Sequence, residues 1–302
     1  MMEYNKGLTE SNFYLDEFAT YLMSIDKSDS TIKTYIEHVQ AFAKWFKETN
    51  DINFDPIVVT EIDIRDMRSY LQGTRHLKET TINLRLASLK SYFEFLEGEK
   101  YIKNNPAKAI KKIKIQSPAA PKSLDEQTYR ALRRHIYRGG NKAHIAMFEI
   151  FTRCGVRNFE LINIRIADID ITERKGNLKV IGKQNKVRHI PLHRDARDAI
   201  NNWMKIRKNI KTEHNNLFVS ERKTPYTRSG IWKIFKKYCE QIGITDVTIH
   251  SFRHYFCRTL LRNGVDISVV AKLAGHASGY VTAQVYTIPR QEELEAAIET
   301  LV

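Results

Sequence analysis

The sequence predicts a mainly α-helical protein of two domains, the second of which also holds a small antiparallel sheet. Three observations support this prediction. The length of 302 residues is enough for two domains that each bury a core. Apolar residues recur at helical spacing over most of the chain, and two short apolar runs flank a glycine-containing turn. Between the two parts, residues 106–122 combine lysines and prolines without an acidic residue, which is typical of a linker.

Residues 1–105 are predicted to form a bundle of four helices joined by short connections. Ser28 or Ser30 is the candidate cap of the second helix, and Thr60 and Thr80 are the candidates for the third and fourth. We expect the apolar stripes of these helices to form a core rather than platforms on which bases stack. Their members are Phe13, Phe18, Tyr21 and Leu22; Ile32, Tyr35, Ile36, Val39, Phe42, Trp45 and Phe46; Ile64, Met67, Tyr70 and Leu71; Ile82, Leu86, Leu89, Phe93 and Leu96.

Residues 123–302 are predicted to form a second, mostly helical domain. Ser123 and Glu126 have the spacing of a capping box, which would begin its first helix. A glycine- and lysine-containing segment at 182–186 would form the tip of a β-hairpin. The strands are predicted at 178–181, 187–192 and 217–220, and the helices at 124–137, 142–153, 195–208, 228–241, 250–263, 267–274 and 291–301.

The charge of the chain points to a polyanionic partner. The 49 lysines and arginines exceed the 35 aspartates and glutamates and give a net charge of +14. Nucleic acid is the commonest partner of this kind, although the charge alone also fits a merely soluble basic protein. Lysines in the linker, beside a domain junction, favour contact with phosphates over a purely solvated tether.

The sequence indicates a cytoplasmic protein. No stretch approaches about 18 apolar residues, and the first residues lack the apolar core of a signal peptide. Cys154, Cys239 and Cys257 are odd in number and far apart, so they fit neither a disulfide framework nor a zinc site. We therefore expect buried, reduced thiols.

A few polar residues carry the candidate chemistry. Two arginines, two histidines, a lysine and a late tyrosine are what a metal-free attack on a phosphodiester needs. Because the in-line transition state gathers negative charge on the phosphate oxygens, a pair of planar guanidiniums is the strongest clamp available without a metal. In chain order the candidate residues are Arg157 with Glu160 (in GVRNFEL), Lys183 (in GKQNK), His250 with Arg253 (in HSFRH), His276 (in LAGH) and Tyr286. His250 and Arg253 are three residues apart, so they share a helix face and both can reach one phosphate.

The order and surroundings of these residues resemble the tyrosine recombinases of the phage-integrase family, and their Xer group in particular. The resemblance implies that Glu160 supports Arg157, either by orienting it or by capping the turn. It also implies a general acid at Lys183, with Lys186 as the rival, and no need for a metal or another cofactor. The catalytic residues implied are Arg157, Lys183, His250, Arg253, His276 and Tyr286.

In this resemblance Tyr286 is the nucleophile. A phenol with a pKa of about 10 is a weak nucleophile at neutral pH, so the nearby cations must stabilise its phenolate. His276 and Tyr286 are ten residues apart, one more than the commonest family spacing. Tyr280 is the nearby rival, but its place after Gly279 fits a turn.

The resemblance further implies that residues 1–105 are a core-binding, SAM-like domain and residues 123–302 the catalytic domain, closing as a clamp around duplex DNA. Four protomers would hold two sites and exchange strands through a 3′-phosphotyrosyl link and a Holliday junction, alone or with a second recombinase or accessory protein. Because the helical core begins about ten residues from Met1, we expect no separate arm-binding domain, which favours an Xer-like protein or a mobile-element resolvase.

Two surfaces are candidates for contacts with partners. The helix predicted at 291–301 has an apolar stripe that would dock on a neighbouring protomer, as in the family, or pack on its own domain. DNA contacts are predicted on the second and fourth helices and in the linker. The residues are Lys33, Arg85 and Lys90, followed by Lys108, Lys111, Lys112 and Lys114.

Two other functions stay open. A type IB topoisomerase uses the same arginine, histidine and tyrosine chemistry but relaxes supercoils as a monomer. A catalytically silent DNA-binding protein would bind DNA without ever forming a covalent adduct.

Overall fold

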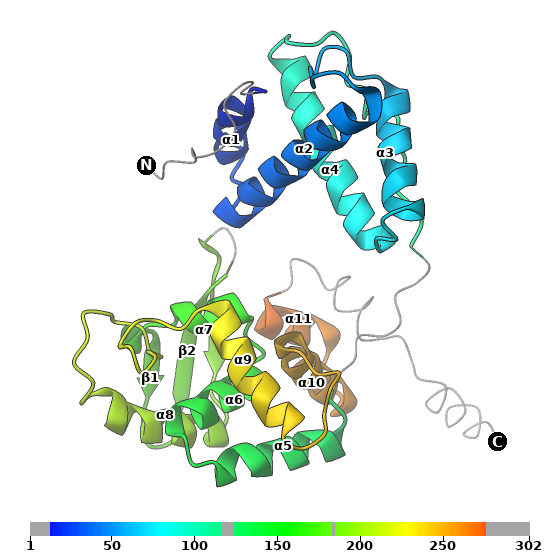
Figure 1. Cartoon of the computed structure of the whole chain (residues 1–302). Coiled ribbons are helices and arrows are strands. Elements are labelled where there is room, and N and C mark those ends of the chain that lie inside the picture. Colours follow the sequence, from blue (N-terminus) through cyan, green and yellow to red (C-terminus); the bar gives the residue numbers. More distant parts are fainter. Residues whose placement is uncertain (1–12, 116–123, 183–184, 276–302) are drawn as a thin grey trace, which may run out of the picture. The chain divides into compact units, whose positions relative to one another are not determined.

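The computed structural model describes residues 13–115, 124–182 and 185–275 (Figure 1). By its internal contacts the chain divides into two compact units, residues 1–118 and 119–302. The predicted fold class is confirmed, because helices dominate both units and the described residues form one small antiparallel sheet, in the second unit.

The described part of the first unit holds four helices, as predicted: α1 (Leu15–Ser24), α2 (Asp29–Asn50), α3 (Glu61–Gly73) and α4 (Glu79–Gly98). The hydroxyl of Ser28 accepts a backbone hydrogen bond from the first turn of α2, and Thr60 forms a capping box at α3. The predicted cap of the fourth helix is wrong. Lys78 precedes α4 without a side-chain cap bond, so Thr80 already lies in the first turn.

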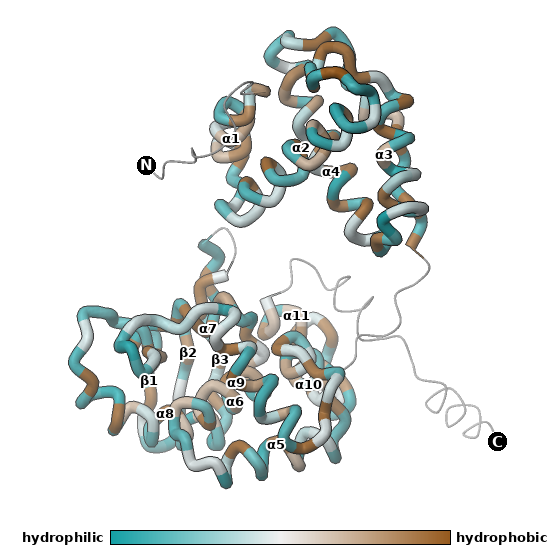
Figure 2. Tube along the Cα trace, in the orientation of Figure 1, coloured by the Kyte–Doolittle hydropathy of each residue, from teal (hydrophilic) through white to brown (hydrophobic). Residues whose placement is uncertain are grey.

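The aromatic stripes of the first unit form its core, as predicted. Phe18, Phe42, Tyr92 and Phe93 are fully buried, and the rings of Phe42 and Phe93 meet edge to face with 6.3 Å between their centroids. The hydroxyl of Tyr92 donates to the carbonyl of Phe13 at 2.7 Å, which satisfies the buried phenol. Figure 2 shows the hydrophobic and hydrophilic residues that alternate along these helices.

Residues 106–115, which the sequence assigned to the linker, pack on the first unit, and we call them the basic strap. Asn83 of α4 holds the strap by donating Nδ2 to the carbonyl of Ile113 at 2.9 Å and accepting from the amide of Ile113 at 2.8 Å. Ala107 is buried, and Ile110 packs against the core. The strap thereby presents four exposed lysines: Lys108, Lys111, Lys112 and Lys114.

The second unit is mostly helical. Its elements are α5 (Glu126–Arg138), α6 (Lys142–Cys154), α7 (Asn158–Asn163), the short 3₁₀ helix η1 (Ile166–Asp168), β1 (Ile169–Ile171), β2 (Gly176–Ile181), β3 (Val187–Pro191), α8 (Arg194–Arg207), α9 (Arg228–Glu240), α10 (Ile249–Arg262) and α11 (Ile267–Ala274). The sheet has the antiparallel order β1-β2-β3, and β2 and β3 form the predicted hairpin, with Ile181 opposite Val187. The cap of α5 is Asp125 rather than Ser123, since the Asp125 carboxylate accepts from the Thr128 amide at 2.6 Å.

The predicted strand at 217–220 is wrong. Leu217, Phe218 and Val219 are buried in succession, and the amide of Leu217 donates to the carbonyl of Ile164 at 2.7 Å. The indole of Trp203 in turn donates to the carbonyl of Leu217 at 2.9 Å. A short apolar run buried on all sides has the same pattern in a strand and in a buried connection, so periodicity cannot separate the two. The third strand is β1, whose three residues are too few to give a periodic signal.

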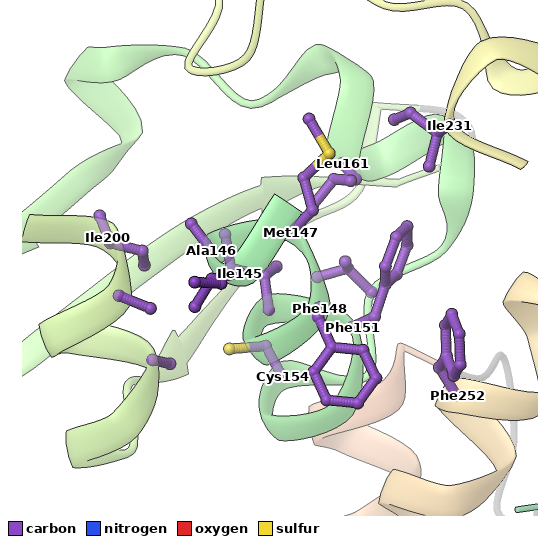
Figure 3. Close-up of a cluster of buried hydrophobic side chains, with 14 of the residues drawn as sticks. Ile145, Ala146, Met147, Phe148, Phe151, Cys154, Leu161, Ile200, Ile231 and Phe252 are labelled. Atoms are coloured by element: carbon purple, nitrogen blue, oxygen red, sulfur yellow. The ribbon is translucent and has the colours of Figure 1, made fainter. Parts of the chain in front are cut away.

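α6 forms the centre of the second unit, in contact with α8 and with α10 (Figure 1). Phe148 and Phe151 of α6 gather with Phe252 of α10 in the hydrophobic cluster that Figure 3 shows. Glu149 is a charged residue buried on this helix, and its carboxylate lies 2.7 Å from Nε of Arg133 on α5. α6 is therefore packed against α5, α8 and α10 along its length before the turn that follows it.

The three cysteines are free and buried, as predicted. Burial raises the pKa of the Cys154 thiol to about 12 and that of Cys239 to about 11. Of the helices that the structure describes, none is long and apolar enough to cross a membrane. The helix predicted at 291–301 lies outside the described residues.

Gly155 ends α6 and lets it approach α10 closely. Its φ of 61° lies in the left-handed region that favours glycine. A β carbon built at Gly155 would lie 2.2 Å from a ring atom of Phe256 on α10. The position therefore needs glycine for its backbone conformation and also for its contact with the neighbouring helix.

Gly155→Ala is expected to destabilise the protein clearly more than Gly243→Ala. Both glycines have positive φ, but a β carbon at Gly243 would meet nothing within 4 Å. The shared backbone cost is about 1–2 kcal/mol, whereas the clash with Phe256 adds a further ~1–3 kcal/mol at Gly155 alone. Urea unfolding of the full-length variants, followed by tryptophan fluorescence, measures both losses. Equal losses would contradict the close approach of α6 and α10.

Candidate active site

Arg157 and Glu160 begin α7, directly after the turn that ends α6. Arg157 is the residue before the first helical position, and its amide donates to Oε2 of Glu160 at 2.7 Å. Its guanidinium also donates, from Nη1 to Oε1 of Glu160 at 3.0 Å. The Glu160 carboxylate is fully buried, whereas the Arg157 side chain is one-quarter exposed. Glu160 therefore both caps the turn and orients the guanidinium, which are the two roles that the sequence left open.

Arg253 connects α10 to the same turn. Thr248 and Ser251 cap the helix, which places His250 in its first turn and the buried Arg253 one turn later. Nη1 of Arg253 donates to the carbonyl of Gly155, two residues before Arg157. The two arginines predicted to clamp a phosphate thus anchor on one turn, although almost a hundred residues separate them in the sequence.

His250 is close enough to both arginines to respond to their charge. Partial desolvation lowers its pKa first, and the guanidiniums of Arg253 and Arg157 lower it further. His254, one turn along α10, has a pKa lowered to about 4 by desolvation, His250 and Arg253. Both imidazoles are therefore neutral at pH 7 in the absence of a ligand, and each can still donate from one nitrogen and accept at the other.

Three of the predicted catalytic residues, Lys183, His276 and Tyr286, lie outside the described residues. The residues that directly precede two of them are described, and both adjoin the Arg157–Glu160 pair. A β carbon at Gly182 would lie 3.6 Å from Oε1 of Glu160. The carbonyl of Gly275, at the end of α11, accepts from Nη2 of Arg157 at 3.0 Å. The chain therefore passes beside this pair immediately before Lys183 and again immediately before His276.

Arg188 on β3 is a residue that the sequence did not single out. Its Nη1 and Nη2 donate to the two carboxylate oxygens of Glu160, each at 2.8 Å, and its Nε donates to the carbonyl of Leu273 at 3.0 Å. The signal that could have found it is strand periodicity. Arg188 shares a strand face with buried Ile190, so a charged residue points inward where an apolar one is expected.

The predicted DNA-binding residues all lie in the first unit, whereas the candidate site belongs to the second. Lys33 is exposed, with Nζ 3.9 Å from the carboxylate of Glu37 on the next turn of α2. Lys90 donates from Nζ to the carbonyl of Lys108 in the basic strap at 3.4 Å. Desolvation and the charge of Arg75 lower the pKa of Arg85. Within the described ranges, no group of three or more histidines, cysteines and acids is placed to hold a metal ion.

Comparison with known proteins places the chain in a family. Residues 122–293 match the phage integrase family, and residues 15–100 match the phage integrase N-terminal SAM-like domain. The chain belongs to this family. It is 31% identical over 277 residues to the tyrosine recombinase XerC of Pediococcus pentosaceus, an alignment that covers 89% of this chain and 90% of that protein. The chain is therefore a tyrosine site-specific recombinase, as predicted.

Solved structures share the fold of the recombinase. The XerH site-specific recombinase bound to palindromic difH substrate in a post-cleavage complex superposes with a TM-score of 0.75, at 16% identity, over 94% of each chain. A lambda integrase tetramer bound to a Holliday junction gives a TM-score of 0.68 at 19% identity, over 88% of the recombinase and 77% of that chain.

Arg157→Gln is expected to raise the pKa of His250. Removing a nearby positive charge makes the protonated imidazole less unfavourable, so protonation occurs at higher pH. Histidine NMR signals followed through a pH titration measure the change. The matched control is Arg194→Gln, because Arg194 is 82% exposed on α8 and is paired with Asp198. A pKa of His250 that stays at its parental value in Arg157→Gln would contradict the proximity of the two groups.

Proposed function

We propose that the recombinase cuts and rejoins duplex DNA at a specific site through a 3′-phosphotyrosyl link at Tyr286. The observation that carries the proposal is the convergence of Arg157, Arg253 and His250 on the turn after α6. Gly182 and Gly275 adjoin the same cluster, one residue before Lys183 and one residue before His276. This arrangement supports a single phosphate site that draws on four separate segments of the chain.

The proposed reaction begins with attack of the Tyr286 oxygen on the scissile phosphorus. Arg157 and Arg253 bind the non-bridging oxygens, where negative charge accumulates, and removing one such donor typically costs about 10²–10³-fold in rate. His250 and His276 donate further hydrogen bonds to this charge. As the bond between phosphorus and the 5′-oxygen breaks, Lys183 gives its proton to the departing oxygen, and the 3′-phosphate stays on Tyr286.

The second half of the proposed reaction reverses the first with a different strand. The phosphotyrosyl ester keeps the energy of the broken bond, so a 5′-hydroxyl from a partner duplex displaces Tyr286 without ATP. Two such exchanges pass through a Holliday junction. We propose a homotetramer on two DNA sites, joined by exchange of the helix at 291–301, with a second recombinase or accessory protein as a further partner. The lambda integrase tetramer on a Holliday junction supports this assembly by its similar fold.

The first unit is proposed to bind the DNA backbone beside the cutting site, in the cytoplasm. The exposed lysines of the basic strap support this role. The carbonyl of Lys108 is already bonded to Lys90 of α4, so the strap and α4 would meet phosphates as one surface. Binding should weaken steeply with added salt, because each phosphate contact releases a counterion.

Membership of the phage integrase family favours strand exchange over both alternatives. A topoisomerase would relax supercoiled DNA that has only one site or none. A silent DNA-binding protein would never trap a covalent complex. An assay for joint products from two sites, run beside a relaxation assay, therefore separates the three functions.

Tyr286→Phe is expected to abolish covalent trapping of a nicked suicide substrate while it leaves binding of the same DNA intact, since only the attacking oxygen is removed. Denaturing gels detect the adduct, and a mobility shift measures binding. Tyr280→Phe is the matched control and should form the adduct at the parental rate. An adduct in Tyr286→Phe, or its loss in Tyr280→Phe, would overturn the choice of nucleophile.

Lys183→Ala is expected to slow cleavage of ordinary DNA but not of DNA with sulfur in place of the scissile 5′-oxygen. A thiolate is the anion of a thiol with a pKa of about 8.5, so it departs without a general acid. Lys186→Ala serves as the control and should cleave both substrates at the parental rate. If the sulfur substrate rescues Lys186→Ala but not Lys183→Ala, the general acid is Lys186.

A further inference from the structure

We infer that Arg188 is a positioning residue for strand cleavage, which keeps Arg157 available to the phosphate and holds the end of α11 beside it. The inference rests on the proposed function, since it assigns Arg188 a part in that reaction. Arg188 is not itself expected to touch DNA, because its side chain is only 12% exposed and its three donor nitrogens already have acceptors.

Arg188 compensates the charge of Glu160 and thereby keeps Arg157 available. This carboxylate is fully buried and receives hydrogen bonds from two guanidiniums, those of Arg157 and Arg188. With Arg157 alone the pair would be neutral, and the carboxylate would offset the charge meant for the phosphate. With both arginines the cluster keeps one net positive charge. Arg188 takes the bidentate position on Glu160, which leaves Arg157 a single side-chain bond to it.

The influences on the pKa of Glu160 agree with this division of roles between Arg188 and Arg157. Desolvation would raise its pKa, but the hydrogen bonds and charge of Arg188, followed by those of Arg157, hold the pKa below its usual value. Glu160 therefore stays ionised at neutral pH, and Arg188 is the larger of the two stabilising influences.

Arg188 also holds the segment that leads to His276. Nε of Arg188 donates to the carbonyl of Leu273, and Nη2 of Arg157 donates to the carbonyl of Gly275. Gly275 has a φ of 68°, and a β carbon there would lie 2.8 Å from Nη1 of Arg188. The guanidinium of Arg188 thus packs against the residue directly before His276 and satisfies a carbonyl at the end of the helix.

Arg188 itself belongs to the hairpin that carries Lys183. Arg188 pairs with Val180 in the β2–β3 ladder, and the amide of Gly182 donates to the carbonyl of Lys186 at 2.8 Å. Because Arg188 lies in the second residue pair from the tip of this hairpin, its bonds to Glu160 fix the hairpin against α7. The side chain of Arg188 therefore joins three segments: α7, which follows Arg157; the hairpin that carries Lys183; and the end of α11, which precedes His276.

The test compares Arg188→Gln with Arg133→Gln in the full-length protein. Arg133 makes a matched control, because it also binds a fully buried carboxylate, that of Glu149, but on α5 and α6. Both changes leave a buried acid short of a partner, so both should lower the unfolding temperature. Only Arg188→Gln is expected to slow single-turnover cleavage, by about 10²-fold as for a small misplacement of reacting groups. Its affinity for the DNA site should stay parental, because the donor nitrogens of Arg188 are all bonded within the protein.

A second readout does not depend on catalysis. Amide hydrogen exchange at Lys272–Gly275 should be faster in Arg188→Gln than in the parent and unchanged in Arg133→Gln. Arg188→Lys keeps the charge but not the three fixed donors, so it should leave this exchange fast and cleavage slow. Parental exchange in Arg188→Gln, parental cleavage in it, or full recovery by lysine would each overturn the inference. A parent that cleaves nothing while its exchange pattern follows the prediction would instead refute the proposed function.

Discussion

The candidate site depends on one constraint, which is that the buried negative charge of Glu160 must be compensated. An unpaired carboxylate in the interior is costly, and in this protein the compensation comes from two arginines that are 31 residues apart in the sequence. Because each arginine also bonds to a backbone carbonyl near the end of α11, the charge of Glu160 fixes the relative positions of α7, β3 and α11. A requirement of folding thereby fixes the geometry on which the proposed chemistry relies.

The packing of α6 against α10 supplies the other half of the site. Because Gly155 has no side chain to meet Phe256, the two helices can approach closely. Arg253 on α10 thereby reaches the carbonyl of Gly155. Desolvation and then the positive charges of Arg253 and Arg157 lower the pKa of His250, so its imidazole is neutral at pH 7. A phosphate at this position would relieve the mutual repulsion of the cations, which is a large part of why a phosphodiester would be drawn to it.

The helices could be predicted from the sequence, because apolar periodicity, Ser28, Thr60 and Gly155 are local signals. Arg157 and Arg253 could be singled out from their motifs, but their shared anchor at Gly155 could not, since it depends on packing between distant segments. Arg188 was hidden by an apolar run in which a single inward arginine looks incidental. The basic strap was assigned to the linker because lysines and prolines dominate its composition, whereas Asn83 and the buried Ala107 decide where it lies.

The shared carboxylate also has a consequence for how this protein can diverge. Replacing Arg188 alone would leave the buried carboxylate of Glu160 only partly compensated. Replacing Glu160 alone would leave two guanidiniums that repel each other. Neither substitution is therefore easily tolerated by itself. Any side chain at Gly275 would displace the Arg188 guanidinium as well. Positions 160, 188 and 275 should therefore be inherited or replaced as a set, and descendants that have altered one of them should carry compensating changes at the others.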